Sequence, residues 1–371
     1  MKILNAIIII AIFVSLGSLV IKNKSNFSKK YDPQHYKEIF EKSQWMEDPK
    51  ARKIVMLDDD QYAYAGWRYA HGGNPTDISF EHPPLAKYII GFSIILFGNQ
   101  YFAPLIGTIL FLSLFYKLAT QYVKSTTALL LIFFISTEYM IQEQLTHSFL
   151  DIWQGNFLLF GLYSLSKLKE SKNWWIGIII SLYGVGATKY YFTAIVYFLF
   201  YFLYFLIQKN RRYLYYLIAS IPIIILLYFI TYIRFFQLQN LYDFVLLNIK
   251  MFRYFRSHVP EYPWFEVWRL LATGGWQTWW GDKGIMKTYY FNILWPILEF
   301  NFIISLSWLW KKEIYKILGP IIWSSVYLLS LSVHILFPHY LLLALPTLYI
   351  LLGWNAEKIL YYIRMRYINR K

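Results

Sequence analysis

The chain has no cysteine, which excludes disulfides, thiol nucleophiles and cysteine metal sites. Charged residues are scarce as well, at 15% of 371 residues, while apolar residues make up 57%. This composition excludes an ordinary soluble domain. The net charge of +15 does not indicate nucleic-acid binding, because no basic helix or single-strand platform accompanies it. In a membrane protein, excess Lys and Arg fits cytoplasmic loops and anionic lipid headgroups.

Long apolar runs predict an all-α polytopic membrane protein. The main runs cover residues 3–21, 213–230, 289–308 and 340–352. They are unbroken, unlike the alternating ten-residue segments of a β-barrel. We expect roughly 9–11 transmembrane helices in one transmembrane domain over residues 1–371, with no separate soluble domain. The first run lacks a small-residue cleavage site, so it is predicted to be a retained helix and not a signal peptide.

Basic connectors predict the orientation of the second half of the chain. They lie at residues 167–172, 208–212 and 311–313, and the C-terminal tail adds four more cations. The positive-inside rule assigns this side to the cytoplasm. Asp151, Lys189, a long loop over residues 232–288, and residues 334–339 then face outward. This distribution predicts a cell-membrane protein whose polar site lies on the external face.

The N-terminal third fits this scheme only if one apolar run fails to cross. Residues 22–84 form a predicted large first external loop, although Lys22, Lys24, Lys29 and Lys30 favour the cytoplasm. Three apolar runs separate this loop from Asp151, at 85–98, 101–120 and 127–141. The first and last are short, so one of them is expected to be re-entrant or to cross incompletely.

An acidic cluster in the first loop is the strongest sign of chemistry. Asp58, Asp59 and Asp60 are consecutive, and residues 81–87 read Glu-His-Pro-Pro-Leu-Ala-Lys at the start of the next apolar run. An isolated acidic run is most simply a solvated loop. Its position ahead of this second motif, at a membrane boundary, favours a catalytic role instead.

Six motifs in order over residues 58–346 resemble the protein O-mannosyltransferase family, within the multi-spanning GT-C glycosyltransferases. Residues 58–59, followed by Tyr62, resemble its Asp-Glu motif, and residues 82–87 resemble its His-Pro-Pro-Leu-x-Lys motif. Glu81 is similar to a glutamate of the aminoarabinose transferases. Similar segments follow at 146–151, with His147 where arginine is usual, at 184–190, more loosely at 258–268, and at 338–346.

The resemblance implies a GT-C fold and an inverting transfer of a sugar from a dolichyl- or polyprenyl-phosphate donor to a hydroxyl group. Mannose and a protein Ser or Thr are the expected sugar and acceptor, and the family often forms dimers. The alternative is a lipid or cell-surface glycan acceptor, as in the aminoarabinose transferases. A transporter is less favoured, because no inverted repeat is present and the polar residues gather on one face.

The expected chemistry needs a base, a phosphate site and a sugar or acceptor site. Asp58 is the predicted base and Asp59 its neighbour, with Asp60 taking the role if the register shifts by one. The candidate donor-phosphate residues are basic, polar or acidic groups predicted to face outward: Glu81, His82, Asp151, Lys189, Arg253, Arg256 and His339. An intramembrane lysine such as Lys189 is costly and usually functional.

Two tryptophans, Trp264 and Trp268, are the candidate sugar or acceptor contacts, and an amphipathic segment in the headgroup layer is an equal alternative. No cofactor is required, because lysine and arginine suffice to neutralise a monophosphate leaving group. A divalent cation at Asp58–Asp60 remains an alternative.

Overall fold

The computed structural model describes residues 2–46, 48, 50, 52–189, 191–257, 263–278, 284–311, 313–333 and 336–368. The described residues form helices with one small hairpin. The first third contains α1 (Lys2–Lys22), α2 (Lys24–Ser28), α3 (Pro33–Glu41), α4 (Asp58–Ala70), α5 (Leu85–Phe97) and α6 (Phe102–Ala119). The middle contains α7 (Ser125–Ser136), α8 (Tyr139–Thr146), α9 (Asp151–Lys167), α10 (Trp174–Thr188), α11 (Tyr191–Ile207), α12 (Arg211–Ala219) and α13 (Ile221–Thr231).

The last third begins with short elements and ends in long helices. It contains α14 (Ile233–Leu238), α15 (Leu241–Ser257), α16 (Glu266–Thr273), α17 (Leu294–Leu306), α18 (Ile314–Ser332) and α19 (Leu345–Ile368). Two 3-10 helices, η2 (Ser307–Trp310) and η3 (Pro338–Leu343), connect the last three. Strands β1 (Gly275–Gln277) and β2 (Ile285–Lys287) pair antiparallel, with Trp276 opposite Met286.

The prediction of an all-α polytopic membrane protein is confirmed. Among the described residues, four helices are long and apolar enough to cross a membrane: α1, α6, α12 with α13 (Arg211–Thr231), and α18. Shorter apolar helices are α5, α10, α11 and the segment Leu294–Leu309. How many of these elements cross, and which side each end faces, stay predictions.

One of the two runs expected to cross incompletely is broken. Helices α7 and α8 pass the same test only as a pair, and they are bent by 70° at Thr137 and Glu138. The other run, α5, is a straight helix of 13 residues. At 1.5 Å per residue α5 is about 20 Å long, which is less than a hydrocarbon layer of about 30 Å.

The two predicted loops contain several helices. Residues 22–84 include α2, α3 and α4, and the acidic cluster forms the first turn of α4 instead of a polar loop. Carboxylates in a first turn are stabilised by the helix dipole, which explains the helix start at Asp58. Residues 232–288 include α14, α15, α16 and both strands. Residues 258–262, which begin the loosely similar segment 258–268, lie outside the described residues.

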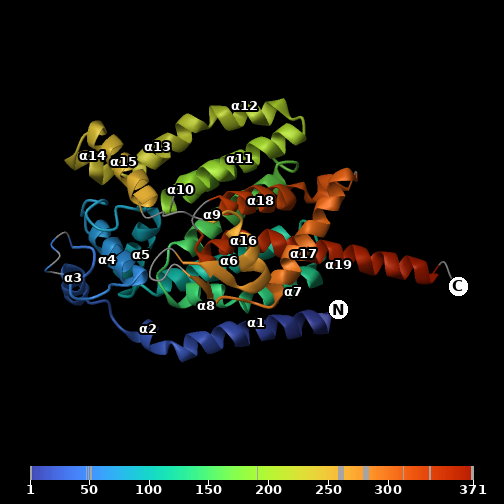
Figure 1. Ribbon diagram of the computed structural model, residues 1–371, viewed down its shortest axis with the longest axis horizontal. Helices are drawn as coiled ribbons and strands as arrows, with labels where there is room; N and C mark the ends of the chain where they lie inside the picture. Colours follow the sequence, from blue (N-terminus) through green and yellow to red (C-terminus); the bar gives the residue numbers. More distant parts are fainter. Residues whose placement is uncertain are drawn as a thin grey trace.

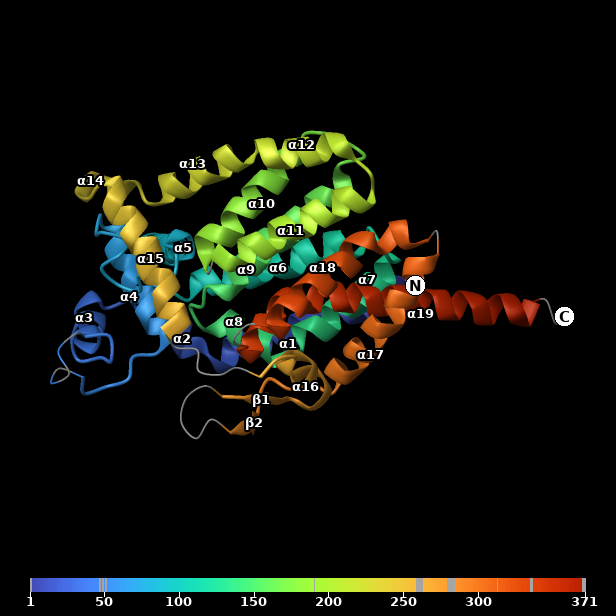
Figure 2. The same cartoon turned by 45° about the horizontal axis from the view of Figure 1, so that its top comes forward.

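The helices form an elongated bundle with the acidic segment at one end. Helices α3, α4, α5, α14 and α15 gather at that end, and α11 turns into α12 at the other (Figures 1 and 2). Helix α19 leaves the bundle and projects beyond it, so that residues 359–366 are exposed (Figure 1). The interior is aromatic, and Trp295, Trp323 and Tyr197 are fully buried.

Candidate active site

The centre of the site is a buried ion pair between two helix ends. Helix α9 begins at Asp151, and α10 ends at Thr188, directly before Lys189. Gly184 lets the two helices approach, because a Cβ at this position would strike the ring of Phe157. The Lys189 Nζ lies 2.6 Å from the Asp151 Oδ1, and the two side chains are only 8% and 10% exposed. A lysine in an apolar segment is therefore paired with a carboxylate from the neighbouring helix.

Helix η3 adds an imidazole and an aromatic ring to this pair. The His339 Nε2 lies 3.4 Å from the Lys189 Nζ and 4.0 Å from the Asp151 Oδ1. Burial, together with the positive charge of Lys189, lowers the pKa of His339 to about 4. His339 is therefore neutral at pH 7 and its Nε2 can accept a hydrogen bond from the ammonium group. The Lys189 Nζ also lies 5.3 Å from the centre of the Tyr340 ring.

A rigid turn between α4 and α5 supplies Glu81 and His82. The Lys87 side chain is fully buried, and its Nζ donates to the carbonyl oxygens of Ser79 and of His82, the latter at 2.6 Å. The Ser79 hydroxyl donates to the Glu81 Oε1 at 2.7 Å. The lysine of the His-Pro-Pro-Leu-x-Lys motif therefore fixes the turn by binding its backbone.

Glu81 and His82 present polar atoms that lack protein partners. The His82 ring lies 6.0 Å from the ring of Tyr62 and 5.6 Å from that of Phe255. Burial lowers the pKa of His82 well below its ordinary value, and Lys189 lowers it further, so the ring is neutral. In the described part of the chain, the buried His82 Nδ1 and Glu81 Oε2 have no hydrogen-bond partner. Buried polar atoms are rarely left in this state, which indicates a place for a polar ligand.

Asp58 alone among the three aspartates belongs to this cluster. Its side chain is exposed, yet it lies in a recess where surrounding protein atoms raise its pKa. Lys189 lowers that pKa in part, while Glu81 and Asp151 raise it. The carboxylate is thus accessible to a substrate and interacts with the charged groups around the ion pair.

The next two aspartates face elsewhere because a helix turns by about 100° per residue. Asp59 is buried, its pKa is raised by burial, and its principal charged neighbour is His147. The pKa of Asp60 is raised to about 6 by burial and by Asp59, with His35 opposing. His147, the residue that replaces the usual arginine, therefore lies beside Asp59 and Asp60.

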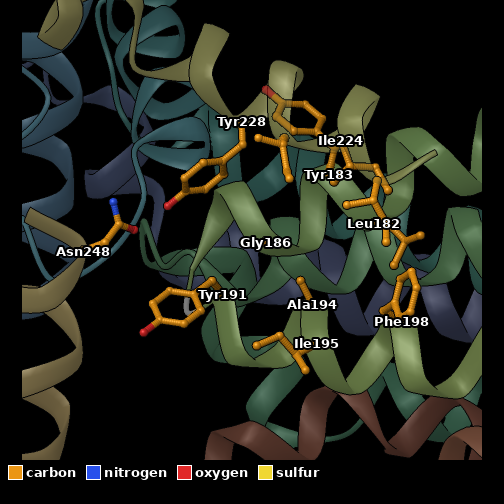
Figure 3. Close-up of a pocket in the computed structure, with 12 residues that line it drawn as sticks. Leu182, Tyr183, Gly186, Tyr191, Ala194, Ile195, Phe198, Ile224, Tyr228 and Asn248 are labelled. Carbon is orange, nitrogen blue, oxygen red and sulfur yellow. The ribbon is translucent and has the colours of Figure 1, made fainter. Parts of the chain in front are cut away.

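The structure does not bring Arg253 and Arg256 into the Lys189 cluster. Both side chains are exposed on α15, where they line a groove of about 560 Å³ together with Tyr191 and Asn248. A second cavity of about 370 Å³ shares Tyr191 and Asn248 with this groove and extends between α10, α11 and α13. Figure 3 shows the hydroxyl groups of Tyr191 and Tyr228 pointing toward the end where Asn248 lies.

This second cavity is almost entirely apolar. Its other walls are Leu182, Ala194, Ile195, Phe198, Ile221, Ile224 and Ile225 (Figure 3). The groove and the cavity together form an apolar channel with two guanidinium groups at one end. Tyr191, the first residue of α11, lines both the groove and the cavity and lies two residues after Lys189 in the sequence.

The two candidate tryptophans have different surroundings. Trp268 donates its indole N–H to the Ser332 hydroxyl at 3.0 Å and stacks on Phe302 at 6.1 Å, so it anchors α16 to α17 and α18. Trp264 is 71% exposed. The geometry therefore leaves Trp264 available to a ligand and gives Trp268 a packing role.

Comparison with known proteins finds one family model and two solved structures that are similar to this chain. Residues 81–254 match the family model described as dolichyl-phosphate-mannose-protein mannosyltransferase. The crystal structure of ArnT from Cupriavidus metallidurans in the apo state superposes with a TM-score of 0.56, at 15% identity, over 81% of this chain and 55% of ArnT. The structure of the same protein bound to undecaprenyl phosphate gives a TM-score of 0.60 at 15% identity. The match covers 95% of this chain and 59% of ArnT. No curated protein sequence matches the chain.

The chain has the GT-C fold. The predicted fold is thus confirmed, and so is the resemblance to the mannosyltransferase family over residues 81–254. The chain spans a little over half the length of the ArnT structures it matches. Identity of 15% relates the folds, and the residue roles below rest on the geometry of this chain.

Three residues close to the candidate site were not functional candidates in the sequence analysis: Tyr62, Tyr340 and Lys87. Each lies in one of the motifs named in the sequence analysis, and this position was the signal that could have identified it. Tyr62 lies one helical turn after Asp58, so it shares the face that carries Asp58. Tyr340 follows His339, and Lys87 acts through the backbone, which sequence spacing does not reveal.

The metal alternative has little geometric support. In the part of the chain that the structure describes, no three or more His, Cys, Asp or Glu side chains form a group suited to a metal ion. Asp58, Asp59 and Asp60 diverge around the first turn of α4. A cation at these aspartates stays a prediction.

Proposed function

We propose that this protein is an inverting glycosyltransferase that uses a polyprenyl- or dolichyl-phosphate sugar, with mannose as the expected sugar and a protein Ser or Thr as the acceptor. One observation carries the proposal. The exposed carboxylate of Asp58 interacts electrostatically with Lys189 and Asp151, and an apolar cavity lies at the start of α11, two residues after Lys189 in the sequence. A base, an anion site and a lipid site therefore occur together.

The reaction follows from these positions. Asp58 takes the proton of the acceptor hydroxyl while the hydroxyl oxygen attacks the anomeric carbon of the sugar. The bond from that carbon to the phosphate oxygen breaks, its electron pair leaves with the phosphate, and the configuration inverts. Lys189 has one N–H left for the phosphate, since Asp151 and His339 each accept one of its three. General-base assistance of this kind contributes about 10²–10⁴-fold.

The apolar channel fits the prenyl chain of the donor. Its walls are aliphatic and aromatic, and Arg253 and Arg256 stand where a phosphate or headgroup would meet the channel. Undecaprenyl phosphate is the ligand of one ArnT structure with the same fold, which supports a lipid-phosphate donor here. Guanidinium groups bind phosphate through paired hydrogen bonds.

The acceptor has a second candidate. ArnT shares the fold, so a lipid or cell-surface glycan remains the alternative to a protein acceptor. Both candidates place the acceptor hydroxyl at Asp58, on the external face of the cell membrane that the basic connectors predict. The discriminating feature is the acceptor itself, and the experiment therefore varies it.

The test uses the purified full chain in proteoliposomes with radiolabelled dolichyl-phosphate mannose and, separately, undecaprenyl-phosphate sugars. Acceptors are a Ser/Thr-rich peptide and a lipid-anchored glycan. We expect label on the peptide, and label only on the glycan would replace the protein acceptor by the alternative. Absence of transfer from every prenyl-phosphate sugar would overturn the enzyme assignment.

A further inference from the structure

A polar cavity, separate from the apolar cavity and groove described above, lies at the end of the bundle remote from Asp58. Its volume is about 420 Å³, and it forms where α6, α9 and α11 end and where α12 and α18 begin. Helix α11 separates it from Lys189, and 17 helical residues span about 25 Å. The region is the turn from α11 into α12 in Figure 2. The proposed transfer reaction has no use for this cavity.

The described residues that line this cavity include cations and donors but no carboxylate. Lys169 and Lys316 are exposed at its edge, and Gln208 and Asn210 supply amides. The acidic residues closest in sequence to the lining residues have partners of their own. Glu170 binds Lys167 at 2.6 Å, Glu313 lies 3.6 Å from Lys358, and Glu357 accepts a hydrogen bond from the Thr127 hydroxyl at 2.6 Å. The cavity therefore has an uncompensated positive charge.

A buried indole also lacks an acceptor at this place. Trp354 of α19 lines the cavity and is only 9% exposed, and its Nε1 has no hydrogen-bond partner among the described residues. An indole N–H only donates, so it requires an electron-rich atom. The lysines by themselves are explained by the helix C-termini beside them, which favour cations. That explanation does not provide an acceptor for Trp354.

The remaining walls suit a lipid better than a free ion. Tyr122, Tyr204 and Tyr213 place rings with hydroxyl groups around the cavity, and Leu165 and Phe205 line its base. Aromatic rings with one polar end are typical of membrane interfaces. Basic pockets between transmembrane helices bind the headgroups of anionic lipids.

We propose that this cavity binds a phosphate group carried by an anionic glycerophospholipid, in the leaflet opposite the one that holds the Asp58 site. Lys169 and Lys316 hold the phosphate, the Trp354 N–H donates to one of its oxygens or to a headgroup hydroxyl, and the acyl chains leave along the bundle. Free phosphate is the other source of the same chemistry.

The test is native mass spectrometry of the full chain in detergent, titrated with phosphatidylglycerol, phosphatidylcholine or inorganic phosphate. The variant Lys169→Gln/Lys316→Gln removes the two cations. The matched control, Lys172→Gln/Arg211→Gln, removes two cations that lie next to lining residues in the sequence but do not line the cavity. Trp354→Phe removes the N–H and keeps the ring.

We expect wild type to retain one phosphatidylglycerol in preference to phosphatidylcholine. Lys169→Gln/Lys316→Gln should weaken that binding by about thirtyfold, the effect of two basic side chains near an anionic headgroup, and the control by less than about threefold. Trp354→Phe should weaken it by about fivefold, which is one lost hydrogen bond.

Two results would overturn the proposal. Equal losses in the two double variants would mean that general surface charge attracts the lipid. Saturation by inorganic phosphate at the concentration that saturates phosphatidylglycerol would assign the cavity to a free anion. Neither result depends on glycosyltransferase activity, so this proposal and the transfer reaction fail separately.

Discussion

Three neighbouring aspartates acquire different chemistry because they occupy successive positions of one helical turn. Asp58 interacts with Lys189, whereas Asp59 and Asp60 have His147 among their charged neighbours. The sequence identified the acidic cluster but left the base open between Asp58 and Asp60, since a motif fixes residue order and not direction. The helix that starts at Asp58 gives the three side chains different directions and different neighbours.

Replacement of Asp58 should abolish transfer without unfolding the protein. Asp58→Asn keeps the size of the side chain and removes the base, so we expect kcat to fall by about 10²–10⁴-fold. Asp60→Asn is the matched control, because it changes the adjacent carboxylate that faces away, and it should retain activity within about tenfold. If Asp60→Asn lowered kcat more than Asp58→Asn, the base would be Asp60.

The pH dependence should show that Asp58 is difficult to ionise. Burial raises its pKa above the value of an unfolded aspartate, so the folded state binds more protons between those two values. Ionisation of Asp58 therefore lowers the free energy of unfolding as pH rises through that interval. Since the base must be ionised, kcat/KM should fall on the acid side at a pH above the ordinary aspartate value of about 3.9. An acid limb at that ordinary value would contradict the buried recess.

Lys189 and Asp151 should stabilise the folded protein as a coupled pair, so that the effects of replacing them on the free energy of unfolding are not additive. Lys189→Gln leaves a carboxylate that is 10% exposed without its cation, and such a loss costs about 3–5 kcal/mol. Asp151→Asn/Lys189→Gln should be destabilised by less than the sum of the single variants, because it leaves no unpaired charge. Thermal unfolding of the four proteins in one detergent measures the coupling, and additive losses would show that the pair is not coupled.

At the scale of elements, the crossing of α4 and α5 determines where Asp58 lies relative to His82. Gly66 and Gly91 face each other at this crossing. A Cβ at Gly66 would meet the carbonyl oxygen of Lys87, and one at Gly91 would meet that of Gly66. Backbone atoms are in the way, so a side-chain rearrangement cannot relieve the contact.

Gly91→Ala should therefore separate the two helices and displace the Glu81–His82 turn. A displacement near 1 Å costs about 10²-fold in rate, and we also expect a lower unfolding temperature. Gly17→Ala is the control, because nothing lies within 4 Å of the added Cβ in α1. Wild-type kcat in Gly91→Ala would show that the crossing does not position the site.

The position of one helix also separates two of the candidate phosphate residues from the others. Helix α15 places the guanidinium groups of Arg253 and Arg256 along the apolar channel, outside the Lys189 cluster. The sequence indicated basic residues in a long external segment, but it gave no means to orient a helix within that segment. Amphipathic α15 takes its direction from packing against other elements.

At the scale of the whole molecule, the two ends of the bundle differ in charge and in proposed ligand. The acidic end holds Asp58 and the ion pair. The other end holds the basic connectors and the polar cavity lined by Lys169 and Lys316. The positive-inside rule then predicts opposite sides of the membrane for the two ends.

Single cysteines test this orientation, and the absence of native cysteine removes background labelling. Lys53→Cys, in the segment before α4, should react with a membrane-impermeant maleimide in intact cells. Lys172→Cys, in the α9–α10 connector, should react only after permeabilisation. Labelling of Lys53→Cys only after permeabilisation would place the acidic end in the cytoplasm and contradict an external site.

The sequence by itself determined the membrane class and the helical fold and supplied most residues of the candidate site, because apolar run length and short motifs are local properties of the chain. It also led to the expectation that one of the runs 85–98 and 127–141 crosses incompletely, and α7 and α8 bend in the second of these runs. Only the tertiary structure decided which aspartate faces Lys189, that Lys87 holds a turn, and that Arg253 lies apart. Those outcomes depend on how α4, α9, α10 and α15 pack across long sequence separations, and residue spacing along the chain does not specify that packing.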